Sequence, residues 1–386
     1  MSNVTGVNAH LADLSNKLIW SAMFVYMLAM FAHLFEWTFG SKGAVAQRSD
    51  AQGATLAETA AAATIGAKAE AEKAAKKVTV TVASAGGGTT TLTRTKLAGE
   101  GAIVVTSGRD DDGLGVDGPG AAGSSAKGDL AGRIAVSLTV LGALCNGGGV
   151  LARGLSVMRP PWGNMYEFSC AFSFTIIGAY LVLLVMGKPV RWMGLPAVVT
   201  STLTLGLATS VLYTDSEQLV PALHSYWLAI HVTTAIICGG AFHAGFVATA
   251  LYLGKDAYDK RIAAGRTTGP FNTAASIWER MPSAASLDKL SYRINALVFP
   301  LWTFTIIAGA IWAEAAWGKY WEWDPKETWS FITWVIYACY LHARATAGWK
   351  GRKAAYLALL AFACFLFNYY GVNIFITGKH SYAGVG

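Results

Sequence analysis

Six of the fourteen tryptophans of this chain lie between positions 312 and 334. Within that stretch, residues 314–327 read Glu-Ala-Ala-Trp-Gly-Lys-Tyr-Trp-Glu-Trp-Asp-Pro-Lys-Glu. Indole rings are large and flat, with an electron-rich face that stacks on other planar groups. An aromatic belt at a membrane boundary is the simpler interpretation of any single tryptophan here. The density and order of the whole group favour a binding surface for a flat, apolar ligand.

The same stretch predicts the start of a helix. Asp324 is followed by Pro325 and, three residues on, by Glu327. An N-cap aspartate, a proline at the first helical position and a glutamate that closes a capping box are typical of a helix N-terminus. Upstream, Trp317 and Trp321 are four residues apart, which predicts that they share one face of a short helix. The expected result is an aromatic shelf next to the Asp324 carboxylate, made of Trp317, Trp321 and Trp323.

Two further stretches accompany the tryptophan-rich one: Pro-Trp-Gly-Asn-Met-Tyr-Glu-Phe at 161–168 and Gly-Val-Asn-Ile-Phe-Ile-Thr-Gly-Lys-His-Ser-Tyr at 371–382. The order Trp-Gly-x-x-Trp-x-Trp-Asp resembles the WWD motif of the haem-handling proteins of cytochrome c maturation. With it, residues 133–386 are similar to the CcsA (ResC) family of System II cytochrome c biogenesis. The resemblance implies a protein that holds haem b at the outer membrane face and delivers it for thioether attachment to the CxxCH motif of apocytochrome c.

The resemblance also implies partners. A CcsB (ResB)-like membrane protein is expected to complete a cytochrome c synthase, or haem lyase, of which this chain is the catalytic part. Whether the chain is active without that protein stays open. A thioredoxin-like apocytochrome reductase is a further expected partner.

The external haem ligands are assigned by resemblance to His231 and His380. Haem iron takes axial imidazoles, and two of them must approach opposite faces of one ring. His231 lies about one turn into a predicted span at 226–253, and His380 follows the last predicted span on the same side. Both can therefore flank the aromatic shelf. His224, seven residues before His231, is interpreted as a hydrogen-bonding neighbour.

Three other histidines lie deeper in their predicted spans. At 1.5 Å per residue, His342, His243 and His33 each fall roughly 22 to 24 Å from the outer boundary. By resemblance, His342 is a ligand of a second haem inside the membrane, whose other ligand comes from the CcsB-like partner. His33 and His243 are alternative second ligands, although helix packing is the favoured role for both.

Polar residues begin the predicted span at 165–186. Asn164, Tyr166 and Glu167 are expected to position the haem ring or its substituents. Asn164 and Glu167 fit a capping box equally well, because they are three residues apart. Arg153 and Arg159 lie nearby on the expected outer side, where binding of haem propionates or simple local tolerance can explain them.

The elements that must position these residues follow from composition. Apolar residues make up 54% and charged residues 14% of the 386, which is typical of a polytopic membrane protein. The five cysteines include no Cys-x-x-Cys pair, so a thiol oxidoreductase and a c-type cytochrome are not indicated. The predicted fold is all-α, a transmembrane helix bundle with an extracytoplasmic tryptophan-rich loop. Eight spans of about 20 residues are expected at 18–39, 131–151, 165–186, 192–213, 226–253, 292–313, 327–346 and 354–376.

Basic residues predict the orientation of these spans. Lys188 and Arg191, the 254–291 connection and the 344–353 turn fall on one side, which the positive-inside rule makes cytoplasmic. Both termini and the tryptophan-rich loop are then extracytoplasmic, in a bacterial plasma membrane. The formal net charge of +7 comes mainly from these inner loops and does not indicate nucleic-acid binding.

One region differs in composition from the rest. It begins Ala-rich, alternates at 78–82 in a way that predicts a short strand, and is rich in Gly, Ser, Thr and Asp at 83–128, which predicts disorder. The expected organisation has three parts: an N-terminal tail with the first helix at 1–40, a cytoplasmic low-complexity insertion at 41–130, and a seven-span haem-handling domain at 131–386.

Two rival functions use the same residues. A cytochrome b-like electron-transfer protein pairs histidines on two helices, and His231 and His243 approximate one such pair without a counterpart on a second helix. A haem exporter is expected to show an inverted internal repeat, and none is apparent. Haem delivery for cytochrome c biogenesis is therefore the predicted function.

Overall fold

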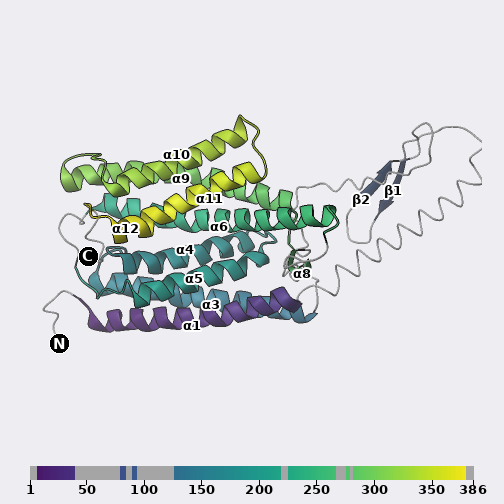
Figure 1. Ribbon diagram of the computed structural model, residues 1–386. Coiled ribbons are helices and arrows are strands. Elements are labelled where there is room, and N and C mark those ends of the chain that lie inside the picture. The colour runs from purple at the N-terminus through teal and green to yellow at the C-terminus, as the bar shows by residue number, and fades with distance from the viewer. Residues whose placement is uncertain are drawn as a thin grey trace, which may run out of the picture. The chain divides into compact units, whose positions relative to one another are not determined.

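The computed structural model describes residues 7–39, 79–83, 89–93, 126–218, 225–266, 275–278 and 281–379. The chain divides into two compact units, Met1–Gly43 with Gly115–Gly386, and Ala44–Leu114. In the first unit the described residues form long helices joined by short connections (Figure 1).

Seven helical segments of the described chain are long and apolar enough to cross a membrane. The remaining expected span, at 327–346, is α10, which has 21 residues but a more polar sequence. The prediction of an all-α polytopic bundle of about eight spans is confirmed. The elements, in order, are α1 (Ala9–Phe39), α3 (Ala126–Val157), α4 (Met165–Val185), η1 (Arg191–Met193), α5 (Gly194–Ser210), α6 (Tyr226–Ala263), α8 (Ala275–Trp278), α9 (Ala284–Trp317), α10 (Pro325–Ala345), α11 (Arg352–Leu366), η3 (Phe367–Gly371) and α12 (Val372–Phe375).

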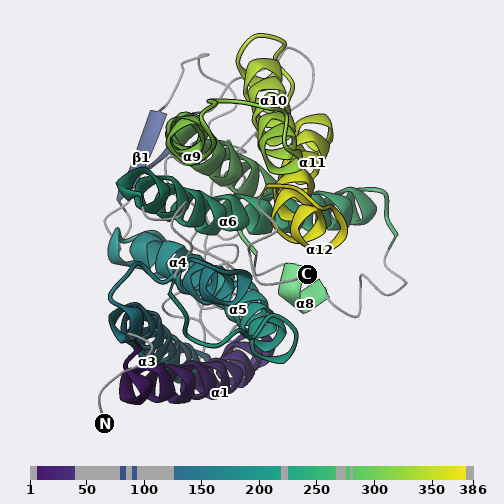
Figure 2. The same cartoon turned by 90° about the vertical axis from the view of Figure 1, so that its left-hand side faces the viewer.

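The helices of this unit pack in order across the bundle. Seen along their axes, α1 and α3 form one edge, α4 and α5 follow, α6 lies in the middle, and α9, α10 and α11 form the opposite edge (Figure 2). The contact between α6 and α9 is one of the most extensive. That contact matters for function, because each of these two helices contributes one side of the site described below.

The last expected span is not one regular helix. It begins as α11, passes through the π-helical turn η3 and ends as the short helix α12. Single π-helical turns inside longer helices are frequent at functional sites, because they change which side chains face the core. Here the turn carries Asn368 and Tyr369, both of which are buried.

The second unit is described only in part. Strand β1 (Thr79–Ala83) pairs antiparallel with β2 (Thr89–Thr93), with Thr79 opposite Thr93. The described part of the alternating stretch, residues 79–82, thus lies in a strand, and β2 falls within the segment for which composition predicts disorder. Residues 126–130 of the predicted insertion are helical and begin α3, so the predicted disorder is wrong for 126–128. The other residues of the predicted insertion lie outside the described part of the chain.

A buried ion-pair network joins α1 to its neighbours. Glu36 is fully buried on α1, and its carboxylate lies 2.8 Å from Nη2 of Arg191, whose Nη1 lies 2.9 Å from Asp129 on α3. His33 completes the network, with Nδ1 3.2 Å from Glu36 and Nε2 3.4 Å from the Thr139 hydroxyl. Both ring nitrogens of His33 are thus engaged by protein groups, which supports the helix-packing role.

We expect Gly132→Ala to destabilise the bundle. A Cβ at this position of α3 would lie 1.6 Å from Arg191 Nη2 and 2.1 Å from Glu36 Oε1, so the methyl group would displace the ion pair. Breaking a buried pair costs about 3–5 kcal/mol. The thermal unfolding midpoint of the purified protein in detergent should fall by several degrees.

Gly178→Ala is the matched control within α4, because nothing lies within 4 Å of a Cβ there. That change should leave the midpoint unchanged or slightly higher, since alanine is the better helix former. Equal destabilisation by the two substitutions would show that the network does not hold α1 in place.

Candidate functional site

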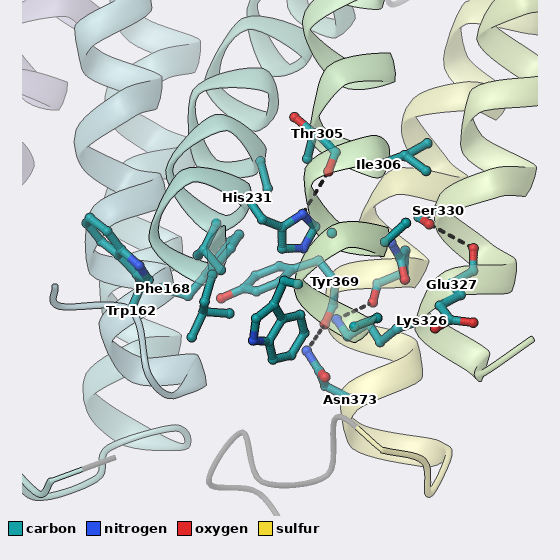
Figure 3. A pocket seen from close by; sticks show the side chains of 18 of the residues that line it. Trp162, Phe168, His231, Thr305, Ile306, Lys326, Glu327, Ser330, Tyr369 and Asn373 are labelled. Carbon is teal, nitrogen blue, oxygen red and sulfur yellow. Dashed lines mark hydrogen bonds between the residues drawn. The ribbon is translucent and has the colours of Figure 1, made fainter. Parts of the chain in front are cut away.

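A cavity lies at the end of the bundle that carries the tryptophan-rich loop (Figure 3). Its empty volume is about 1230 Å³, including the part that is open to the outside. The walls come from α4, α6, α9, α10 and η3 and are mostly apolar. Aromatic residues of the lining are Trp162, Phe168, Trp302, Trp312, Trp317, Tyr320, Trp321, Phe365 and Tyr369. The cavity therefore offers aromatic and apolar surfaces that suit a flat, apolar ligand.

His231 lies in the wall of this cavity, on the first turns of α6. Its Nδ1 lies 2.8 Å from the Thr305 carbonyl oxygen on α9 (Figure 3). A carbonyl can only accept, so Nδ1 carries the proton and donates it. The neutral ring then has its lone pair on Nε2, the form in which an imidazole binds a metal, and the bond fixes the orientation of the ring.

The close approach of His231 to α9 requires a glycine. A Cβ on Gly309 would lie 2.7 Å from both Cε1 and Nδ1 of the imidazole. One turn further along α9, the buried Trp312 stacks on the imidazole with ring centroids 6.3 Å apart and planes at 13°. Trp317 meets Trp312 edge to face at 4.9 Å. The imidazole is thus held between a backbone carbonyl and an aromatic wall.

The short helix expected to carry both Trp317 and Trp321 is absent, and that prediction is wrong. Helix α9 ends at Trp317, and Gly318 follows in the left-handed conformation with φ +74°. Glycine adopts this conformation without strain and commonly ends a helix. The loop that follows still brings Trp321 to the cavity, so both indoles line it by a different route.

Trp323 does not line the cavity. Its side chain is 65% exposed, and its backbone has a left-handed φ of +59°, which is uncommon outside glycine. The indole meets Trp321 edge to face, with centroids 5.7 Å apart and planes at 90°. Trp323 therefore supports the cavity wall from outside, whereas Trp321 forms part of it.

The predicted helix start at Asp324 is confirmed. Asp324 is the N-cap of α10, Pro325 follows, and the Glu327 carboxylate accepts the backbone N–H of Asp324 at 3.1 Å in a capping box. Glu327 also accepts from the N–H of Glu322 at 2.9 Å, so it holds the loop as well as the helix. A local sequence signal was sufficient here, because all partners lie within a few residues of one another.

Asp324 also makes a contact that no local pattern predicts. Its Oδ2 accepts the Lys326 N–H at 3.2 Å, and its Oδ1 accepts the N–H of Lys379 at 2.7 Å. The Lys379 ammonium pairs with Glu322 and lies 5.3 Å from the centroid of the Trp317 ring. The tryptophan-rich loop is thus tied to the segment that follows α12.

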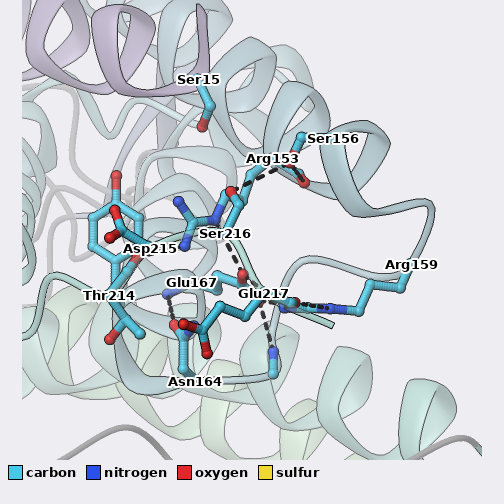
Figure 4. A network of polar contacts seen from close by, with 12 residues as sticks. Ser15, Arg153, Ser156, Arg159, Asn164, Glu167, Thr214, Asp215, Ser216 and Glu217 are labelled. Carbon is cyan, nitrogen blue, oxygen red and sulfur yellow. Dashed lines mark hydrogen bonds and ion pairs between the residues drawn. The ribbon is translucent and has the colours of Figure 1, made fainter. Parts of the chain in front are cut away.

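Asn164 and its neighbours divide between two sites. Asn164 lines the cavity, and its side chain caps α4 by accepting the N–H of Glu167 at 2.9 Å. Glu167 lies instead in a polar network behind the cavity wall (Figure 4). Tyr166, also outside the lining, is buried against Tyr213, with ring centroids 5.1 Å apart. The cap is therefore the role that these contacts support for Asn164.

Arg153 and Arg159 both bind the buried Glu167 carboxylate. Arg153 Nε lies 3.1 Å from Oε1, and Arg159 Nη1 lies 2.7 Å from Oε2. The Gly163 N–H donates to the same carboxylate at 2.8 Å. Neither arginine lines the cavity, so the propionate role considered for them has no support in this geometry. Their pairing with Glu167 explains why they are tolerated on the expected outer side.

The cation in the cavity wall is Lys326, a residue that the sequence analysis did not select. Its ammonium donates to the Asn368 carbonyl at 2.8 Å and lies 5.9 Å from the centroid of the Tyr369 ring. The only feature of the sequence that could have indicated Lys326 is its position: it follows the Trp-x-Trp-Asp motif closely and is the second residue of α10.

The other histidines have separate environments. His243 is buried on α6, and its Nε2 lies 3.0 Å from the Thr200 hydroxyl, which supports a role in helix packing. It does not line the cavity. His342 is exposed on α10. His224 and His380 lie outside the described residues.

Comparisons with known proteins give consistent names. Residues 162–380 match the family described as cytochrome C assembly protein. The cytochrome c biogenesis protein CcsA of Synechococcus sp. (strain JA-2-3B'a(2-13)) is 34% identical over 301 residues, covering 66% of this chain and 84% of that protein. CcsA of Synechococcus elongatus (strain ATCC 33912 / PCC 7942 / FACHB-805) is 35% identical over 278 residues, covering 62% and 84%. CcsA of Mesostigma viride is 38% identical over 242 residues, covering 58% and 77%.

Asp324→Asn should loosen the segment after α12, because both carboxylate oxygens accept N–H groups and an amide has only one acceptor. Whichever way the amide turns, its NH₂ would face an N–H donor. An unmade bond of this kind costs about 1–3 kcal/mol. Hydrogen exchange of residues 376–379 should become about tenfold faster or more.

Glu322→Gln is the control, since it weakens only the pairs with Lys319 and Lys379, and exposed pairs contribute about 0–1 kcal/mol. Its exchange should stay close to wild type. Unchanged exchange in Asp324→Asn would mean that the bond to Lys379 does not hold this segment.

Proposed function

Because the chain belongs to the CcsA family of cytochrome c assembly proteins, we propose that its cavity holds haem b and presents it to apocytochrome c. Its role in cytochrome c biogenesis follows from the family and from its polytopic helical fold. What the proposal adds is the place and the manner in which haem is held.

The observation that carries the proposal is His231 in the cavity wall. The bond from Nδ1 to the Thr305 carbonyl selects the tautomer whose Nε2 can ligate iron, and the ring is held against Trp312. We propose His380 as the second axial ligand, on the family pattern. Asp324 binds the backbone of Lys379, the residue that directly precedes His380 in the chain.

The aromatic walls supply the rest of the binding. Trp317, Trp321 and the other indoles of the lining offer apolar faces to a flat ring, and stacking of this kind is worth about 0.5–1.5 kcal/mol per pair beyond the buried area. Since the cavity is open at one side, an edge of the ring can remain accessible. Apocytochrome c would bring its two thiols to that edge, so that the chain contributes mainly proximity and orientation.

We propose a separate role for His342. It is exposed on α10, away from the cavity lining, and an ionisable side chain at membrane depth is costly unless it meets a partner. Its expected partner is a CcsB (ResB)-like membrane protein, which would supply the other ligand of an inner haem. His33 is a poor substitute, because both of its ring nitrogens already contact protein groups. His243 is a poor substitute because it is buried within the bundle, with its Nε2 against the Thr200 hydroxyl.

The remaining assignments belong to the same proposal. The cavity faces the outside of a bacterial plasma membrane, with both termini extracytoplasmic, and residues 41–130 form a cytoplasmic insertion without a part in the chemistry. With its partner the chain acts as cytochrome c synthase, and a thioredoxin-like reductase keeps the apocytochrome thiols reduced.

His231→Gly and His380→Gly test the axial ligands. Each change should lose most of the bound haem or shift its absorption spectrum, because the iron loses a nitrogen ligand. Added imidazole should restore part of the signal by filling the space left by the side chain. Spectra of the purified variants, with and without imidazole, measure this.

His10→Gly, an exposed position on α1, is the control and should leave the haem spectrum unaltered. If none of the histidine variants affects bound haem, ligation by two histidines is wrong.

The two neighbouring tryptophans should differ. Trp321→Ala removes part of the cavity wall and should reduce haem retained on purification several-fold, whereas Trp323→Ala should have a smaller effect, because that side chain is largely exposed. Haem content per protein, from pyridine haemochrome absorbance, gives the comparison. A larger loss in Trp323→Ala would place the haem outside this cavity.

A further inference from the structure

Lys326 has an unusual environment for a cation. Its ammonium lies in the wall of the cavity, between the Asn368 carbonyl and the face of Tyr369 (Figure 3). The two carboxylates that neighbour it in sequence, those of Asp324 and Glu327, accept backbone N–H groups. No ion pair of Lys326 occurs among the residues that the structure describes. A cation in a mostly apolar wall is favoured when an anion comes close to it.

A second polar group lines the cavity beside it. Asn368 is 9% exposed, and its Oδ1 has no hydrogen-bond partner in the described chain. A buried polar atom of this kind costs free energy until something binds it. Turning the amide would present its NH₂ to an acceptor, and the backbone of the same residue already holds the Lys326 ammonium. Two groups that are incompletely satisfied within the protein therefore lie together in one wall.

The local backbone strengthens the preference for an anion. Lys326 is in the first turn of α10, where the helix dipole favours negative charge. Asn373, also in the lining, donates its amide to the Tyr369 carbonyl at 2.7 Å and so fixes the η3 turn that carries Asn368. The wall made by α10 and η3 thus combines a charged donor, an amide and a positive helix end. The Glu327 carboxylate lies in the same lining, where it accepts the backbone N–H groups of Glu322 and Asp324.

We propose that Lys326 and Asn368 form a carboxylate-binding subsite in the cavity wall. The subsite rests on the proposed function and defines its substrate class more narrowly: a flat, apolar ring that carries a free carboxylate. Haem b has two such groups, its propionates. A ring without them would leave the Lys326 ammonium unpaired, so the subsite discriminates against it.

The test compares haem with haem dimethyl ester, in which both carboxylates are capped while the ring and iron are unchanged. Purified full-length protein is titrated with each, and the change in Soret absorbance gives the dissociation constant. Wild type should bind haem about tenfold to a hundredfold more tightly than the ester, the range expected for hydrogen bonds to a charged group. Lys326→Met should weaken haem binding by a similar factor and leave the ester unaffected.

Lys319→Met is the matched control, because it removes the same charge from an exposed position in the loop that precedes α10. It should keep the wild-type preference for haem. If Lys326→Met does not accumulate, the preference of the wild-type protein still decides the matter.

Equal binding of haem and ester by the wild type would overturn the subsite while leaving haem binding in the cavity intact. Equal losses of both ligands in Lys326→Met would also overturn it, since Lys326 would then act through structure alone. If wild type binds neither, the proposed function fails and the subsite with it.

Discussion

The hydrogen bond from His231 to the Thr305 carbonyl is the contact on which the site depends. It joins α6 to α9, sets the tautomer of the imidazole and holds the ring in the cavity wall. The bond can form only because Gly309 lets the imidazole approach the backbone of α9. The packing of α6 against α9 therefore determines how the imidazole of His231 is oriented, and with it the direction of the Nε2 atom.

A second constraint acts on the loops outside the helices. Asp324 and Glu327 accept backbone N–H groups from Glu322, Asp324, Lys326 and Lys379, and Asp324 also accepts from the backbone of Glu327 in the capping box. Two carboxylates thus hold the tryptophan-rich loop, the start of α10 and the segment after α12 in one arrangement. The motif aspartate has a structural reason to be a carboxylate, since both of its oxygens accept N–H groups. In the proposed function, this arrangement keeps the aromatic wall and the residue next to His380 together.

The parts of the fold that depend on local or periodic signals could be predicted from the sequence. Span positions follow from apolar length, and the α10 start follows from a capping box whose partners are near neighbours. The path from Trp317 to Trp321 was mispredicted, because a four-residue spacing implies a shared face only if the helix continues, and Gly318 ends it. Lys326 and the pairing of Glu167 with two arginines were missed because they depend on contacts between distant segments.

The central claim is that His231 binds haem iron in this cavity with a second histidine on the other face of the ring. Low-temperature electron paramagnetic resonance of ferric haem bound to the purified protein tests it most directly. Two axial imidazoles predict a low-spin, six-coordinate signal, with nitrogen couplings that change when the histidines are labelled with ¹⁵N. A high-spin, five-coordinate signal, or a low-spin one that does not respond to labelled histidine, would contradict the account.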